Sequence, residues 1–231
     1  ARTREGIQQL KEQMARLTSQ ETGEKRLAAD LVKPLDTVIL VVPIDKAAPK
    51  GRLILPQQQT IRSLLDAGCI PVVTRETELA RTLSLLREPP ALVVTDSQAF
   101  GMVSRIVPDS VRLTSFSILF ARYKGDLRTA VLGAAALRQL KDGDTVLISE
   151  GCTHHRQCND IGTVKLPRWI TAHTGRQFSF SFSSGNSFPE DLTPYRLVVH
   201  CGGCMLNQRE METRAARAAA QGVPISRWFK I

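Results

Sequence analysis

Thr37-Val-Ile-Leu-Val-Val42 is a short β-branched run with no polar residues between its apolar ones. A strand with one face in water alternates apolar and polar residues, so this run predicts a strand that is buried on both faces. Such strands belong to parallel sheets with helices packed on both sides. The run therefore predicts an α/β fold.

The segments after this run alternate between helical and strand patterns. Residues 56–67 begin with a proline, carry apolar residues at helical spacing and end before Gly68, which predicts a helix. The next segments read as a strand at 70–74, a helix at 76–87, a strand at 91–95 and a weaker strand at 111–114. Short apolar strands between helices indicate parallel βαβ units.

A second series of the same kind starts near Gly125. It predicts a helix at 126–140, strands at 145–149, 178–182 and 195–200, and helices at 163–173 and 204–220. An amphipathic helix is also expected in the first 17 residues, because Ile7, Leu10, Met14 and Leu17 have helical spacing. The expected fold is two parallel-sheet α/β domains with flanking helices, preceded by an N-terminal helix. The expected boundaries are 1–26 for a connector helix, 27–124 for the first domain and 125–231 for the second.

Composition narrows the possible functions. The 231 residues are 42% hydrophobic and 23% charged, which is typical of a globular protein. The net charge of +9 is spread along the chain, and the 5% of aromatic residues do not interleave with Lys or Arg, so no nucleic-acid partner is expected. The longest uncharged run, 177–189, is too short and too polar to span a bilayer. We expect a cytoplasmic protein without a membrane partner, since the start has no signal-peptide pattern.

The cysteines point to metal or redox chemistry. There are five, an odd number, in a chain without an export signal, which argues against a disulfide framework. Cys69 lies in an apolar segment and is expected to be a small buried hydrophobe. The other four, Cys152, Cys158, Cys201 and Cys204, gather toward the end of the chain.

Three of these cysteines are expected to converge. Cys152 follows the strand at 145–149, and Cys201 directly follows the strand at 195–200, so both lie at the same edge of a parallel sheet. Cys204 is expected at the start of the next helix, where the helix dipole stabilises a thiolate. Gly202 and Gly203 let the backbone pass close to a bulky ligand and direct its amides at sulfur.

Three ligands suit such a site on the residues alone. Thiolates with nearby imidazoles bind either a zinc ion or an iron–sulfur cluster. Cys201 and Cys204, which lie between a strand and a helix, also have the spacing of a redox dithiol. The residues therefore leave a zinc-stabilised or dithiol redox enzyme domain as an alternative to a cluster-binding protein.

Three segments of the second domain resemble a known family. They read Gly151-Cys-Thr-His-His155, Asp160-Ile-Gly-Thr-Val-Lys-Leu-Pro-Arg-Trp169 and Leu197-Val-Val-His-Cys-Gly-Gly-Cys-Met205. They are similar to the cluster-binding domain of HydF, the maturation GTPase of FeFe hydrogenases, and residues 36–58 resemble its dimerisation domain. The resemblance spans residues 31–224. It implies a homodimeric scaffold that holds a 4Fe-4S cluster on Cys152, Cys201 and Cys204.

The same resemblance implies a cargo and partners. The scaffold would carry the transient di-iron precursor of the active site to the apo-hydrogenase, and would also meet the radical-SAM maturation enzymes. The family's GTP-binding domain is expected to be missing, because no Gly-x-x-x-x-Gly-Lys-Ser/Thr motif occurs and no Gly precedes a Lys. We therefore expect no enzymatic activity from this chain, a connector role for its first helix, and an end that comes sooner than in the family.

The fourth corner of a cubane cluster needs a further ligand. An exchangeable oxygen or nitrogen ligand allows a carrier to load and release, so His154, His200, Asp160 or water is expected there. Cys158 would close the site and is not favoured. His155 is expected to be packed or exposed to solvent.

Overall fold

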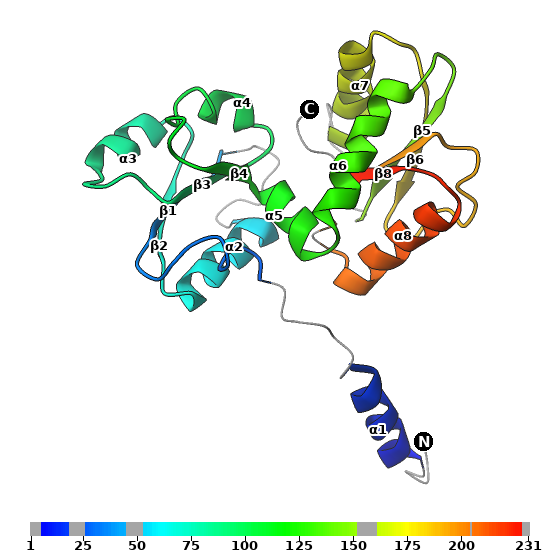
Figure 1. Cartoon of the computed structure of the whole chain (residues 1–231), viewed down its shortest axis with the longest axis horizontal. Coiled ribbons are helices and arrows are strands. Elements are labelled where there is room, and N and C mark those ends of the chain that lie inside the picture. The colour runs from blue at the N-terminus through cyan, green and yellow to red at the C-terminus, as the bar shows by residue number, and fades with distance from the viewer. Residues whose placement is uncertain (1–5, 19–25, 45–52, 152–160, 204, 228–231) are drawn as a thin grey trace.

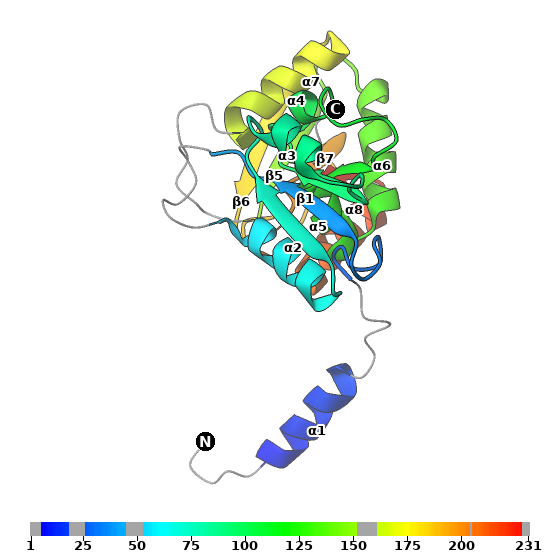
Figure 2. The ribbon, with the colours of Figure 1, turned by 90° about the vertical axis from the view of Figure 1, so that its left-hand side faces the viewer.

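The computed structural model describes residues 6–18, 26–44, 53–151, 161–203 and 205–227. Figure 1 shows two α/β units next to each other, and the helix α1 (Ile7–Thr18) lies apart from both in this view and in Figure 2. Each unit has one four-stranded parallel sheet with helices packed on it. The predicted fold class is confirmed, and so is the helix in the first 17 residues.

The first unit has the strand order β2-β1-β3-β4. Its elements, in chain order, are β1 (Thr37–Val41), α2 (Leu55–Asp66), β2 (Ile70–Thr74), α3 (Leu79–Leu85), β3 (Leu92–Thr95), α4 (Phe100–Val103), β4 (Leu113–Ser115) and α5 (Phe116–Tyr123). The central strand β1 explains the opening sequence run. Val38 and Leu40 belong to the core on one face of the sheet, whereas Ile39 and Val41 belong to the core on the other face.

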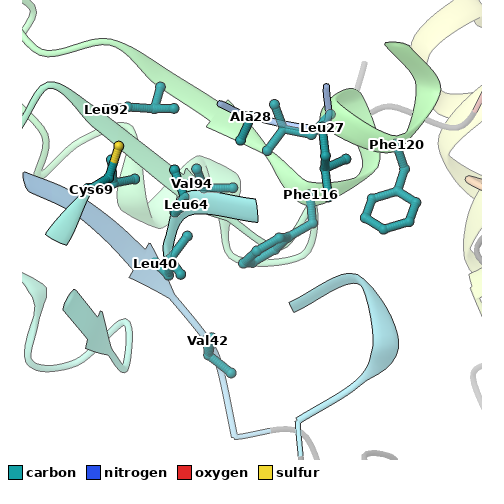
Figure 3. Close-up of a cluster of buried hydrophobic side chains, with 12 residues drawn as sticks. Leu27, Ala28, Leu40, Val42, Leu64, Cys69, Leu92, Val94, Phe116 and Phe120 are labelled. Atoms are coloured by element: carbon teal, nitrogen blue, oxygen red, sulfur yellow. The ribbon is translucent and has the colours of Figure 1, made fainter. Parts of the chain in front are cut away.

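Figure 3 shows the core that lies between this sheet and the helices α2 and α5. Leu64 of α2 and Phe116 and Phe120 of α5 pack there, all of them almost inaccessible to solvent. Cys69 is part of the same cluster, as expected, and its thiol donates to the carbonyl of Lys33 at 3.3 Å. Burial raises the pKa of this thiol, so Cys69 has the character of a structural residue.

The second unit has the strand order β6-β5-β7-β8. Its elements are α6 (Leu127–Ala135), the 3-10 helix η1 (Ala136–Gln139), β5 (Thr145–Glu150), the π-helical turn η2 (Ile161–Lys165), α7 (Leu166–Thr174), β6 (Ser179–Ser184), β7 (Leu197–His200), α8 (Gln208–Ala220) and β8 (Ile225–Arg227). Helix α6 packs very closely on β8. A Cβ atom added to Gly133 of α6 would overlap the backbone of Ile225.

One predicted helix begins later than expected. The helix predicted for 204–220 starts at Gln208, because the side-chain oxygen of Asn207 accepts from the amide of Glu210 at 2.8 Å and caps the helix. Position 204 therefore precedes the helix by several residues. The expected helix start at 204 was wrong, and Cys204 itself lies outside the described residues, so its thiolate character stays a prediction.

Helices α5 and α6 join the two units through residues 124–126. Asp126 caps α6, with its carboxylate accepting from the amides of Arg128 and Thr129. The ammonium group of Lys165, at the end of η2, lies 3.3 Å from the side-chain oxygen of Gln98 in the first unit. In the parts of the chain that the structure describes, no helix is long and apolar enough to cross a membrane.

Candidate metal centre

The two strands that lead to the cysteine motifs are neighbours. β5 and β7 pair in parallel, and Ser149 lies opposite His200 in the register. Both strands therefore end at the same edge of the sheet, where Gly151 and Cys201 follow them. This is the edge at which open α/β folds assemble their binding sites.

Cys201 lies at the centre of the described part of this edge. Its sulfur is buried and accepts two backbone hydrogen bonds, from Gly151 at 3.0 Å and from Gly203 at 3.3 Å. The guanidinium of Arg227 interacts with the Cys201 sulfur electrostatically. Burial nevertheless lowers the pKa of Arg227 overall. Two amide donors and a nearby cation favour the thiolate, which is the form that binds metals.

The glycines around Cys201 differ in what they contribute. Gly203 has a φ of +65°, and an added Cβ would lie 2.5 Å from the sulfur of Met211. An added Cβ on Gly151 would lie 2.9 Å from the side chain of Leu206. Gly202 has open space around it. Of the two glycines singled out in the sequence, only Gly203 occupies a position where a side chain would clash. Gly151 is the second amide donor to the Cys201 sulfur, and the sequence did not predict it.

His200 is held by two partners whose roles are fixed. Its Nδ1 lies 2.8 Å from the carbonyl oxygen of Cys201, and its Nε2 lies 3.0 Å from Nη1 of Arg214. A carbonyl only accepts and a guanidinium only donates, so Nδ1 carries the proton and Nε2 accepts. Burial lowers the pKa of His200 to about 3, so its ring is neutral. A metal at either nitrogen would have to displace one partner, which makes His200 a less favourable fourth ligand than His154, Asp160 or water.

Arg214 is a buried residue that sequence reasoning missed. This residue on α8 is 1% exposed, and its side chain pairs with Glu210 at 2.7 Å and donates to the carbonyl of Gly185 at 2.7 Å. Its guanidinium also lies 4.9 Å from the centre of the Phe188 ring. The available signal was its place on the apolar face of the predicted helix, which it shares with Met211 and Ala218.

A second buried cation, Lys124, lies at the junction between the domains and contacts the cysteine loop, which is the segment 201–206. The ammonium group of Lys124 donates to the carbonyl of Gly203 at 3.1 Å and to that of Leu206 at 2.8 Å. No spacing rule links Lys124 to these residues, because 79 positions separate it from Gly203. Two buried cations, Lys124 and Arg227, therefore contact backbone carbonyls of the cysteine loop.

The described residues fit a thiolate-bound metal group. They provide a buried sulfur, amides directed at it, nearby positive charge and a glycine where the backbone turns. The other predicted site residues, Cys152, His154, His155, Cys158, Asp160 and Cys204, lie outside the described residues. Within the described ranges no three His, Cys, Asp or Glu side chains form a metal-binding group.

Comparison with protein families gives two matches that follow one another along the chain. Residues 27–125 match the hydrogen maturase F dimerization domain, and residues 128–228 match the hydrogen maturase F tetramerization domain. The chain is thus a hydrogenase-maturation protein built from two domains named for self-association. It belongs to the hydrogen maturase F (HydF) family, and the resemblance seen in its sequence motifs is confirmed.

Other comparisons add little. No curated protein matches the chain. One solved structure, from a study of fatty acyl-adenylate ligases from E. coli and L. pneumophila, is 14% identical with a TM-score of 0.32. The match covers 77% of this chain and 43% of that one, so the chain spans less than half of that structure. This likeness is too low to bear on function.

Proposed function

We propose that this chain is a scaffold that holds a 4Fe-4S cluster on Cys152, Cys201 and Cys204 and carries the di-iron precursor of the hydrogenase active site. The supporting observation is the pair of amides on the Cys201 sulfur. Gly151 directly precedes Cys152 and Gly203 directly precedes Cys204 in the sequence. Adjacent Cα atoms are about 3.8 Å apart, and we propose that Cys152 and Cys204 bind the same metal group as Cys201.

The cluster would supply one iron that binds an exchangeable ligand. The residues of this chain would hold the cluster and shield it from solvent. His154, Asp160 or water remains the proposed fourth ligand. Cys158 is proposed to stay unbound, because a fourth thiolate would close the site. Buried cations such as Arg227 compensate the negative charge that three thiolates bring.

The role is binding and delivery, not catalysis by this chain. The apo-hydrogenase is the proposed recipient, and the radical-SAM maturation enzymes are the proposed source of the precursor. GTP would act through the GTP-binding domain of the family. We place this activity in the cytoplasm, where free thiols persist.

Self-association of the first domain is proposed to involve its free edge. β2 is one of the two outer strands of its sheet, and Ile70 and Val73 on this strand are 49% and 48% exposed. Exposed β-branched residues on an edge strand favour pairing with another chain. A second copy of this chain, joined across a twofold axis, would cover them.

The test is anaerobic reconstitution with iron and sulfide, followed by metal analysis. We expect a brown protein with about four irons per chain. Cys201→Ala should lose this iron, whereas Cys69→Ala, the matched control at a buried structural cysteine, should keep it. Equal iron in both variants would refute the assignment, and a colourless protein with one zinc would favour the zinc-domain alternative.

A further inference from the structure

Lys124 belongs to the first domain but contacts the second. It directly follows helix α5, whose Phe120 lies in the core of the first domain. Arg122 of the same helix forms an ion pair with Asp30 at 2.6 Å, which ties α5 to the beginning of that domain. The backbone of Lys124 is therefore anchored in the dimerisation domain.

The side chain of Lys124 is directed into the second domain. The residue is 8% exposed, and its ammonium group lies 5.4 Å from the centre of the Phe120 ring. Its hydrogen bonds to the carbonyls of Gly203 and Leu206 bracket the end of the cysteine loop. A buried ammonium is costly unless it is hydrogen-bonded, so these carbonyls are strong restraints on where the loop lies.

Gly203 connects this restraint to the cysteine sulfur. Its amide donates to Cys201, and its carbonyl accepts from Lys124. The left-handed conformation at Gly203 holds both groups in these directions. If Lys124 is removed, the Gly203 carbonyl loses a charged donor and the loop loses a fixed point.

Arg227 contacts the same loop and the junction between the domains. Its guanidinium lies 3.4 Å from the carbonyl of Gly202 and 3.5 Å from that of Lys124 itself. A Cβ added to Gly125 would overlap this guanidinium, so the junction packs tightly against it. The loop is thus hydrogen-bonded both by Arg227 of β8 in its own domain and by Lys124 of the first domain.

We propose that Lys124 is a positioning residue of the cysteine loop, supplied by the dimerisation domain, that orients Gly203 toward the Cys201 sulfur and places positive charge beside the metal group. The first part concerns the protein alone. The second part rests on the proposed function, because it requires the cluster. A fixed positive charge stabilises the more negative, reduced form of a cluster, and cluster potentials respond to charge and to hydrogen bonds at sulfur.

The first part is tested on the metal-free full chain by hydrogen exchange. Lys124→Met keeps the length and apolar stem of the side chain but removes the ammonium. We expect the amides of residues 203–206 to exchange at least about tenfold faster in this variant. Lys141→Met, at an exposed lysine of the second domain, is the control and should match the wild type. Unchanged protection in Lys124→Met would overturn the positioning role.

The second part is tested on the reconstituted protein by redox titration. We expect a lower midpoint potential in Lys124→Met than in Lys141→Met or the wild type. An unchanged potential overturns the charge role. If Lys124→Met does not fold, Lys124→Gln removes the charge while keeping N–H donors, and the potential should still fall. If the wild type binds no iron, the proposed function fails, and the exchange experiment still decides whether Lys124 positions the loop.

Discussion

Replacing Gly203 with alanine tests the geometry of the cysteine loop directly, because its neighbour provides a matched control. Gly203 has a φ of +65° and faces the buried side chain of Met211. Gly202 lies in the same loop, lacks a positive φ and has nothing within 4 Å of an added Cβ. Gly202→Ala and Gly203→Ala therefore make the same chemical change in two different environments.

The expected cost at Gly203 has two parts. An L-residue in the left-handed region loses about 1–2 kcal/mol. The added Cβ would lie 2.5 Å from the Met211 sulfur, and overpacking of a buried site costs about 1–3 kcal/mol. Stiffening of the unfolded chain offsets about 0.4–1 kcal/mol of this. We expect Gly203→Ala to lower the free energy of unfolding by about 2–4 kcal/mol and Gly202→Ala to leave it unchanged or raise it by up to about 1 kcal/mol.

The assay is urea unfolding followed by tryptophan fluorescence. Both tryptophans, Trp169 and Trp228, belong to the second domain, so the signal reports on the domain that carries the loop. At a slope of about 2 kcal/mol per molar urea, the midpoint of Gly203→Ala should fall by roughly 1–2 M. Combining it with Met211→Ala should cost less than the sum of the single changes, because the clash is relieved.

Equal urea midpoints for the two glycine variants would contradict this reasoning. That result would mean that the loop in solution has neither the left-handed turn nor the contact with Met211. Full additivity in the combined variant would contradict the contact alone and leave the turn intact. The two outcomes thus separate backbone strain from side-chain overlap.

Three further predictions concern other parts of the chain. Arg214→Met should lower the free energy of unfolding by about 2–4 kcal/mol in the urea assay, because His200 loses its hydrogen-bond donor in a buried site. Arg209→Met, on the exposed side of the same helix, should cost under about 0.5 kcal/mol. Similar costs for the two variants would show that Arg214 is not buried. Val73→Lys should lower the oligomeric state seen in sedimentation experiments because it places charge on an edge strand, and assembly identical to the wild type would exclude β2 as an interface. The hydrogen bond with Arg122 lowers the pKa of Asp30 below 3.8. This half-exposed ion pair stabilises the fold by about 1 kcal/mol or less. The stabilisation is present above pH 3.8 and is lost as the pH falls through the lowered pKa of Asp30. The difference in urea midpoint between the wild type and Asp30→Asn should therefore vanish in acid, and a difference that persists there would contradict this assignment.

The central strands of the sheets were predictable from sequence because burial on both faces requires an uninterrupted run of apolar residues. Val38 to Val41 carry no polar residue since each contacts one of two cores. Helix α5 was not predicted, because a short apolar segment such as residues 116–123 does not distinguish a helix from a strand by periodicity. Strand β8 has only three residues, too few to form a pattern.

The candidate site was predictable only in part, for a related reason. Cys201 follows a strand, and its place at the sheet edge follows from parallel pairing. Arg214 and Lys124 reach the site through packing between distant segments, which no local pattern records. The hydrogen bond from Arg214 to Nε2 of His200, which makes this histidine a less favourable ligand, could not be foreseen for the same reason.

The close packing around β8 requires small residues at two positions, and this requirement defines a sequence pattern that can be searched for in genomes. Gly125 and Gly133 stand eight positions apart, and each meets β8, the first at Arg227 and the second at Ile225. A sequence that retains both glycines and the Ile-x-Arg strand keeps the framework that brings a cation beside Cys201. Distant homologues could be sorted by this pattern even where their cysteine motifs have diverged.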